Sequence, residues 1–137
     1  MNNSSFSISV HILTLLAGAK GEMLSSEYMA GSININPVLV RKELINLRDH
    51  GLVATREGKN GGAYLNKPAA EIYLSDVYEA VKRSSSLLGQ SKNAPNPACA
   101  IGRQITNHLN NLYSDAEKAM VDQLRTVTLE KFVQQFN

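Results

Sequence analysis

The side chains with the most evident chemistry are hydrogen-bond donors in the middle of the chain. Residues 36–67 hold six basic and three acidic side chains, a surplus of three positive charges. Arginine, lysine and asparagine offer donors that fit phosphate oxygens and the edges of nucleic-acid bases. The whole chain of 137 residues has a formal net charge of only +2. We therefore expect a local cationic surface on a single domain with at most an appendage, rather than a protein that coats polyanions along its length.

Residues that could perform catalysis are present but scattered. His11, His50 and His108 lie far apart in the sequence, and no two of them have the spacing of a metal site on a helix. The serines at 84–86 fit a loop. Lys59 follows Gly58 but lacks the upstream glycine and the following serine or threonine of a phosphate-binding loop. No nucleophile is accompanied by a base and an orienting acid. We therefore expect neither an enzyme nor a bound metal or other cofactor.

The central donors need a helix to position them, and residues 36 to about 50 predict one. Asn36 is a good N-cap, and Pro37 suits the first helical position, where its missing N–H costs nothing. Gly51 predicts the end of the helix. One side of this helix is apolar, which leaves its N-terminal turn on the other side exposed. The apolar stripe consists of Val40, Leu44 and Leu47.

A shorter helix precedes this one and a β-hairpin follows it. Ser25 or Ser26 can cap the shorter helix, which we expect to end at Gly31. The segments 52–55 and 63–66 have the alternation of short strands, and a glycine-rich turn joins them. A two-stranded ribbon is marginal alone, so it must pack on the helices.

The order of these elements predicts a winged helix-turn-helix in a mainly α fold with a small β-hairpin. In that arrangement the N-terminal turn of the second helix enters the major groove of DNA. The hairpin can reach the adjacent backbone or the minor groove. Each cation alone fits an ordinary solvated surface, but a capped helix and a basic hairpin in this order are more specific. The predicted DNA-binding residues are Ser26, Asn36, Val38, Leu39, Arg41, Lys42 and Arg48, with Arg56, Lys59 and Asn60 on the wing.

The first helix carries a weak polar stripe, which argues against an export signal or a membrane-spanning segment at the start of the chain. Ser7, His11, Thr14 and Gly18 recur at helical spacing, and Phe6, Val10, Leu13 and Ala17 recur at the same spacing on another face. This pattern favours a mostly buried amphipathic helix over an export signal, which also needs a positive start. No apolar run approaches the roughly 20 residues that span a bilayer.

We divide the chain into three parts. Residues 1–83 form the expected DNA-binding domain, including a connecting helix over 71–83. Residues 84–98 form a loop, and residues 99–137 form a long helix and a short terminal one. The long helix shows a seam at spacings of 4, 3, 4 and 3, which is typical of a coiled coil, and we favour a dimer contact over packing within the chain. The seam consists of Ile105, Leu109, Leu112, Ala116 and Ala119.

Five segments together resemble the Rrf-type winged-helix regulators, relatives of the iron–sulfur regulator IscR, NsrR and CymR. Among these the chain is most similar to members without a cluster, such as YwnA. The resemblance implies a cytoplasmic, homodimeric bacterial transcription factor, usually a repressor, that binds an inverted-repeat operator in double-stranded DNA. The segments are Phe6–Ala17, Leu24–Ala30, Ile35–Val53, Asn60–Leu65 and Ile72–Val81.

The resemblance is incomplete at the position where relatives hold a metal cluster. Cluster-binding members carry three cysteines in the loop before the long helix, whereas Cys99 is the only cysteine of this chain. Gly102 stands where a histidine ligand can occur. One thiolate cannot hold a cluster that needs about four ligands, so we predict no bound iron. We favour Cys99 as a small, partly buried structural residue, with a redox switch as the alternative.

Three hypotheses for function stay open at this point. The first is a dimeric, sequence-specific DNA-binding regulator, which we favour. The second is a protein-interaction adaptor that keeps the winged-helix shape. The third, compatible with the first, is a regulator that senses a small molecule in a pocket between the long helix and the N-terminal unit.

Overall fold

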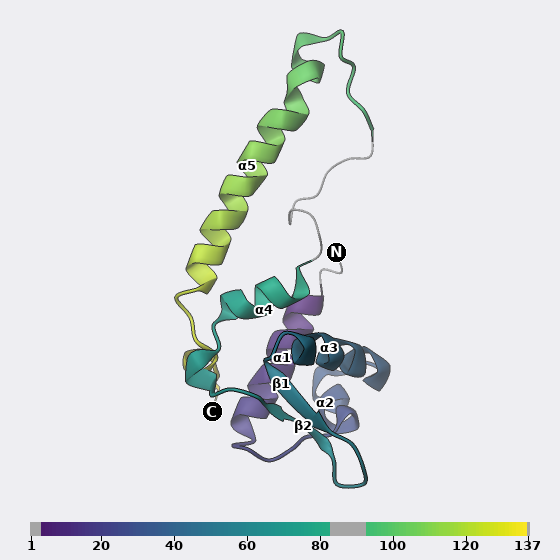
Figure 1. Cartoon of the computed structure of the whole chain (residues 1–137), viewed down its shortest axis with the longest axis vertical. Helices are drawn as coiled ribbons and strands as arrows, with labels where there is room; N and C mark the ends of the chain where they lie inside the picture. The colour runs from purple at the N-terminus through teal and green to yellow at the C-terminus, as the bar shows by residue number, and fades with distance from the viewer. Residues whose placement is uncertain (1–3, 83–92, 137) are drawn as a thin grey trace.

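The N-terminal body is built around helix α1, against which the other short helices and a hairpin pack (Figure 1). The computed structural model describes residues 4–82 and 93–136. In those residues the fold is mainly helical with one two-stranded antiparallel sheet, as predicted. The elements are α1 (Ser5–Gly18), α2 (Ser26–Ile33), α3 (Pro37–Asp49), β1 (Val53–Arg56), β2 (Gly62–Leu65), the 3₁₀ turn η1 (Ala69–Glu71), α4 (Leu74–Val81), α5 (Ala100–Leu124) and α6 (Leu129–Val133).

The start of α3 is the one that the sequence predicts. Asn36 is its N-cap, with Oδ1 accepting a hydrogen bond from the N–H of Val38 at 2.9 Å, and Pro37 occupies the first turn. The helix ends at Asp49, and Gly51 then adopts a φ of 76°, a conformation that glycine tolerates.

The predicted end of α2 is wrong. The helix continues through Gly31 to Ile33, and Asn34 turns the chain with a φ of 65°. Asparagine is among the few non-glycine residues that adopt this left-handed conformation readily. The N–H groups of Asn34 and Ile35 both donate to the carbonyl of Ala30, at 2.7 and 3.1 Å, and this turn directs the chain into α3.

Each end of the two strands lies one residue from its predicted position, 52–55 and 63–66. A third segment pairs with the hairpin. Its register pairs Val53 with Leu65 and Arg56 with Gly62. The backbones of Leu24 and Ala63 exchange two hydrogen bonds, of 3.0 and 2.9 Å. The wing is therefore held to the segment before α2 and does not depend on its two strands alone.

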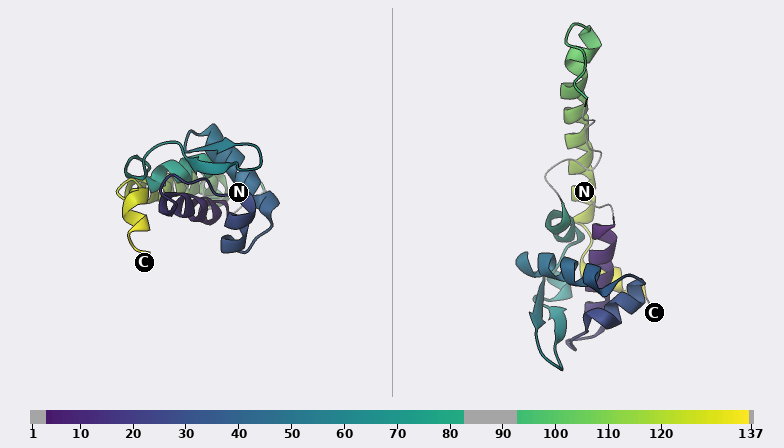
Figure 2. Two further views of the ribbon diagram at one scale, coloured as in Figure 1. Left: turned by 90° about the horizontal axis from the view of Figure 1, so that it is seen from below. Right: turned by 90° about the vertical axis from the view of Figure 1, so that its right-hand side faces the viewer.

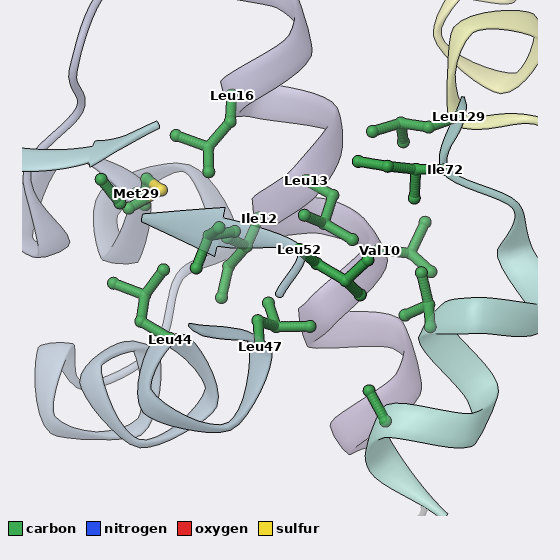
Figure 3. Close-up of a cluster of buried hydrophobic side chains, with 14 of the residues drawn as sticks. Val10, Ile12, Leu13, Leu16, Met29, Leu44, Leu47, Leu52, Ile72 and Leu129 are labelled. Carbon is green, nitrogen blue, oxygen red and sulfur yellow. The ribbon is translucent and has the colours of Figure 1, made fainter. Parts of the chain in front are cut away.

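One hydrophobic core joins the helices to the hairpin (Figure 3). From α1 it receives Ile12 and Leu13, which are fully buried, and from α3 it receives the predicted stripe. Leu129 of α6 is also fully buried beside Ile72 (Figure 3), and the Leu129 N–H donates to the Ile72 carbonyl at 2.7 Å. Helix α6 therefore packs into the same core as α1–α4.

The connecting helix is shorter than the predicted range 71–83. η1 ends at Glu71, α4 spans only Leu74–Val81, and residue 83 lies outside the described residues. Of the predicted loop 84–98, residues 84–92 also lie outside them, and residues 93–98 form neither helix nor strand. Within the ranges 4–82 and 93–136 no helix is long and apolar enough to cross a membrane.

Helix α5 extends away from the body as a rod (Figures 1 and 2). It has 25 residues, none of which is buried. Near its C-terminal end Glu117 accepts hydrogen bonds from the Tyr78 hydroxyl at 2.8 Å and from Lys82 Nζ at 3.3 Å. These contacts attach α5 to α4, and from there the N-terminal half of α5 extends away from the body (Figure 1).

Candidate DNA-binding surface

The surface is built on the outward side of α3. Val40, Leu44 and Leu47 anchor the opposite side in the core. This leaves Val38 and Leu39 exposed, at 60% and 42% of their area. Apolar side chains held in water at a helix N-terminus are suited to contact thymine methyl groups in a major groove. Arg41 and Lys42 are exposed on the next turn.

Two exposed side chains of this region were missed by the sequence analysis. Ile45 of α3 is 52% exposed, one turn beyond Arg41, and Tyr64 of β2 is 38% exposed. The signal for Ile45 was available, because its position falls outside the apolar stripe of α3. Tyr64 is opposite Ala54 in the hairpin, and its neighbours Ala63 and Leu65 face the other way.

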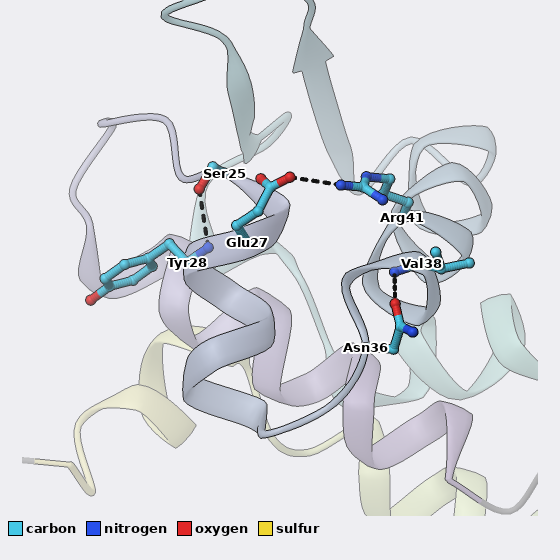
Figure 4. A network of polar contacts seen from close by, with 6 residues as sticks. All are labelled: Ser25, Glu27, Tyr28, Asn36, Val38 and Arg41. Atoms are coloured by element: carbon cyan, nitrogen blue, oxygen red, sulfur yellow. Dashed lines mark hydrogen bonds and ion pairs between the residues drawn. The ribbon is translucent and has the colours of Figure 1, made fainter.

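Asn36 has a structural task that limits its predicted role. Its Oδ1 is occupied by the Val38 N–H, as Figure 4 shows. Only the amide NH₂ is therefore left to donate to DNA. The cap also fixes the direction in which the first turn of α3 leaves the turn at Asn34.

Arg41 forms an ion pair that the sequence analysis did not predict. Its Nη2 donates to Oε1 of Glu27, in the first turn of α2, at 2.7 Å (Figure 4). A hydrogen bond from its own backbone N–H and the Arg41 guanidinium lower the pKa of Glu27 from its ordinary value of 4.5. The carboxylate is therefore ionised at neutral pH and holds the guanidinium from across the helix-turn-helix.

The wing carries its predicted donors at an exposed tip. Arg56, Lys59 and Asn60 are all exposed there. The tip needs glycine at Gly61, where an added Cβ would overlap the Arg56 carbonyl. At Gly62 a Cβ would lie 2.5 Å from the carbonyl oxygen of Leu24. Leu24 belongs to the segment that anchors the wing.

The two other predicted residues lie at the ends of the surface. Arg48 Nη1 approaches Thr55 Oγ1 of β1 at 3.5 Å, and its Nε is 4.0 Å from Asp49 Oδ1. Ser26 is half-buried in the first turn of α2, because Ser25 rather than Ser26 is the cap and accepts from the Tyr28 N–H at 3.1 Å.

Glu43 lies on the core side of α3 rather than on the candidate surface. Glu43 is only 3% exposed on the core side of α3, and among the described residues its Oε1 has no hydrogen-bond partner. Of the three acidic residues between 36 and 67, Asp49 and Glu57 are exposed, whereas five of the six basic residues are exposed and Lys67 is half-buried.

Cys99 differs from the expectation of a partly buried residue. It is exposed and is the N-cap of α5, where its Sγ accepts from the Gly102 N–H at 3.5 Å. Hydrogen bonds from the backbone N–H groups of Gly102 and Ile101 lower the pKa of the thiol from its ordinary value of 9.0. The burial argument for a purely structural residue is therefore wrong.

The donor groups near Cys99 do not fit an iron–sulfur cluster. The sequence has one cysteine, and within residues 4–82 and 93–136 no group of three or more His, Cys, Asp or Glu side chains could hold a metal ion. Gly102 has no room for a histidine in its place, because a Cβ there would lie 2.5 Å from the Asn96 carbonyl oxygen.

The predicted seam of α5 is at the surface of the single chain. Leu112 is 60% exposed, Ile105 is 36% exposed, Ala116 and Ala119 are exposed, and Leu109 is half-buried. Ile101, one turn before Ile105, extends the same apolar side. Glu117, which contacts α4, lies on a different side of the helix.

Sequence comparison relates the chain to known regulators over almost its whole length. A family model named Rrf2, described as an iron-dependent transcriptional regulator, matches residues 2–135. YwnA of Bacillus subtilis strain 168, which carries the name of an HTH-type transcriptional regulator, is 36% identical over 130 residues, 95% of each chain. YffB of Lactococcus lactis, with a name of the same kind, is 33% identical over 81 residues, 58% of this chain and 52% of YffB.

Solved structures share the arrangement of elements. A crystal structure described as that of a DNA binding protein has a TM-score of 0.75 and 32% identity, covering 94% of this chain and 98% of that one. IscR of T. potens has a TM-score of 0.72 at 17% identity, covering 100% of this chain and 88% of its own. CymR of Bacillus subtilis has a TM-score of 0.68 at 18% identity, with coverages of 100% and 98%. The last two show the common fold.

Proposed function

This chain belongs to the Rrf2 family of DNA-binding transcriptional regulators, and from that premise we propose that it is a homodimeric repressor of inverted-repeat operators in the cytoplasm. The observation that carries the proposal is the exposed N-terminal turn of α3 beside a cationic wing. Val38, Leu39, Arg41 and Lys42 of that turn read base edges, and the wing contacts the backbone.

The roles divide by the chemistry of each side chain. Arg41 can donate two parallel hydrogen bonds to a guanine, while Val38 and Leu39 contact methyl groups. Lys59 at the wing tip and Arg48 beside the hairpin neutralise phosphates, which positions the protein without reading sequence. The half-buried Ser26 and the NH₂ of Asn36 contribute hydrogen bonds to the backbone at the edge of the surface.

Substitution of one residue of each kind tests this division. Arg41→Ala is expected to relax base preference at one operator position by about 1–3 kcal/mol. Lys59→Ala is expected to weaken binding to all sequences alike. It should also reduce the slope of log affinity against log salt concentration by about one. Binding is measured on an operator obtained by footprinting the protein on genomic fragments. Equal losses on every sequence for both variants would reduce Arg41 to a backbone contact, and binding that ignores salt would favour the adaptor.

We also propose that the regulator works without an iron–sulfur cluster, because the chain supplies one cysteine and Gly102 cannot be replaced by a ligand side chain. The test is iron content and visible absorbance of protein purified without oxygen. We expect no cluster absorbance, and stoichiometric iron and sulfide would refute the proposal.

A second candidate, regulation by oxidation of Cys99, is favoured by the exposure of the thiol and its lowered pKa. A lower pKa leaves more thiolate at neutral pH, so the native chain should react with iodoacetamide faster at about pH 7 than the urea-unfolded chain. Peroxide should then weaken operator binding by the wild type and leave Cys99→Ser unaffected. Equal alkylation rates, or equal responses of both proteins to peroxide, would exclude the switch.

A further inference from the structure

A cavity of about 920 Å³ lies in the N-terminal body, lined mainly by α1, α2 and residues 132–136, with the segment after α1 and the start of α4 completing it. It is not between the long helix and the N-terminal unit, where the sequence analysis placed a sensing pocket. Both α2 and α6 pack on α1, and the cavity opens along α1 between them. We call it the α1 pocket. None of the predicted DNA-binding residues is among its described lining.

The α1 pocket accounts for the polar stripe of α1. All four members of the stripe, Ser7, His11, Thr14 and Gly18, line it. His11 Nε2 lies 3.0 Å from Ser32 Oγ of α2, so the bond joins two walls. The Thr14 hydroxyl donates to the Val10 carbonyl at 2.7 Å, which leaves its oxygen able to accept a second bond. A helix that only packed in a core would have no use for these groups.

The other walls are aromatic. Tyr28 of α2 is 61% exposed, and Phe132 of α6 packs against Phe136 with ring centroids 5.4 Å apart. Predominantly apolar walls with a few polar groups, in a volume of roughly 300–1,000 Å³, are typical of sites for small organic molecules. Aromatic side chains in these walls favour a flat aromatic ligand.

The charges of the lining restrict the ligand further. Among the described residues that line the α1 pocket there is no lysine or arginine, and Glu22 is the one carboxylate. A phosphate or carboxylate would therefore lose its hydration without gaining a permanent counter-charge. We propose that the α1 pocket binds an uncharged aromatic molecule bearing a hydroxyl or amide group, and that its occupancy controls the DNA affinity assigned under the proposed function.

The route to the DNA-binding surface is short. Tyr28, in the pocket wall, follows Glu27, whose carboxylate holds Arg41 of α3 at 2.7 Å. A ligand that hydrogen-bonds to His11 competes with Ser32 and so changes how α2 is held to α1. Displacement of α2 would move Glu27 relative to α3, and with it the orientation of the Arg41 guanidinium.

The structure offers a matched pair of variants to test binding. A Cβ at Gly18 meets no atom within 4 Å, so the leucine of Gly18→Leu would occupy the pocket without a backbone clash. Gly31 of α2 is equally open but does not line the pocket, so Gly31→Leu is the control. Both changes replace a helical glycine and should stabilise their helices to a similar degree.

The first measurement is the binding of 1-naphthol, followed by its fluorescence, to the full chain without DNA. We expect saturable binding by the wild type and by Gly31→Leu, and binding more than about tenfold weaker by Gly18→Leu and for 1-naphthoate. Absence of binding at millimolar naphthol, as when a second copy of the chain covers the pocket, would overturn the proposal. So would equal binding by both glycine variants, or tighter binding of the carboxylate.

The second measurement is operator affinity with and without 1-naphthol. We expect the affinity of the wild type to change severalfold and that of Gly18→Leu to be insensitive to naphthol. Binding of naphthol with no change in operator affinity would refute the regulatory part. Because naphthol binding is measured without DNA, failure of the proposed DNA-binding function would show separately, as absence of operator binding by the unliganded wild type.

Discussion

At the residue scale, Glu27 restricts the orientation of the Arg41 guanidinium. Arg41 belongs to α3 and Glu27 to α2, yet their side chains are 2.7 Å apart and both are largely exposed. An exposed ion pair contributes little to stability, because water and salt screen it. Its significance is therefore geometric: the carboxylate limits the directions in which the guanidinium can donate to a base.

We predict that Glu27→Gln alters base preference only at the operator position read by Arg41. A change of up to about fivefold is expected from the energy of an exposed pair. The measurement is a double-mutant cycle with Arg41→Ala on operators that differ at single bases. If Glu27 acted only as a negative charge near phosphates, Glu27→Gln would raise affinity for every sequence, and the effect would persist in the Arg41→Ala background.

At the element scale, one tyrosine joins α4 to α5. Tyr78 is 4% exposed, and its hydroxyl donates to Glu117 at 2.8 Å. Burial, and then this hydrogen bond, raise the pKa of Tyr78 to about 12 from its ordinary value of 10.0. Between these two values the unfolded chain releases a proton that the folded chain keeps, so alkali favours unfolding there.

We predict that the free energy of unfolding decreases as pH rises from about 10 to about 12, and that Tyr78→Phe removes part of this decrease. Below pH 10 the contribution of Tyr78 should be constant. The measurement is urea denaturation across this range. Tyr64→Phe, at an exposed position of β2, is the control. An identical decrease in Tyr78→Phe and Tyr64→Phe would show that Tyr78 is not the group responsible.

At the scale of the whole molecule, packing among the described residues of one chain does not account for the exposed apolar side of α5. Within residues 4–82 and 93–136 this helix of 25 residues has no buried side chain, so its apolar seam is exposed there. Such a helix is about 37 Å long, comparable to the roughly 34–36 Å between half-sites one DNA turn apart. Pairing of two α5 helices would cover the apolar seam of each.

We predict that the double variant Leu109→Glu/Leu112→Glu is monomeric and binds an inverted repeat more than about tenfold more weakly than the wild type. Charges placed in an apolar seam must be desolvated on pairing. Mass is measured by light scattering and affinity by titration. Asn111→Glu, an exposed position of α5 outside the seam, is the matched control. An unchanged mass for the double variant would refute the dimer contact.

Local signals in the sequence were sufficient to predict several features of this protein. The cap at Asn36 and Pro37, the stripe of α3 and the glycine-rich wing act within a few residues, so their positions could be predicted along with the exposed donors they carry. Such signals could not determine contacts between segments far apart in the chain. The end of α2 at Asn34, the Glu27–Arg41 pair and the α1 pocket depend on how helices pack, and the exposure of Cys99 depends on where α5 extends. These features follow from tertiary packing, because burial and side-chain contact are properties of neighbours in space.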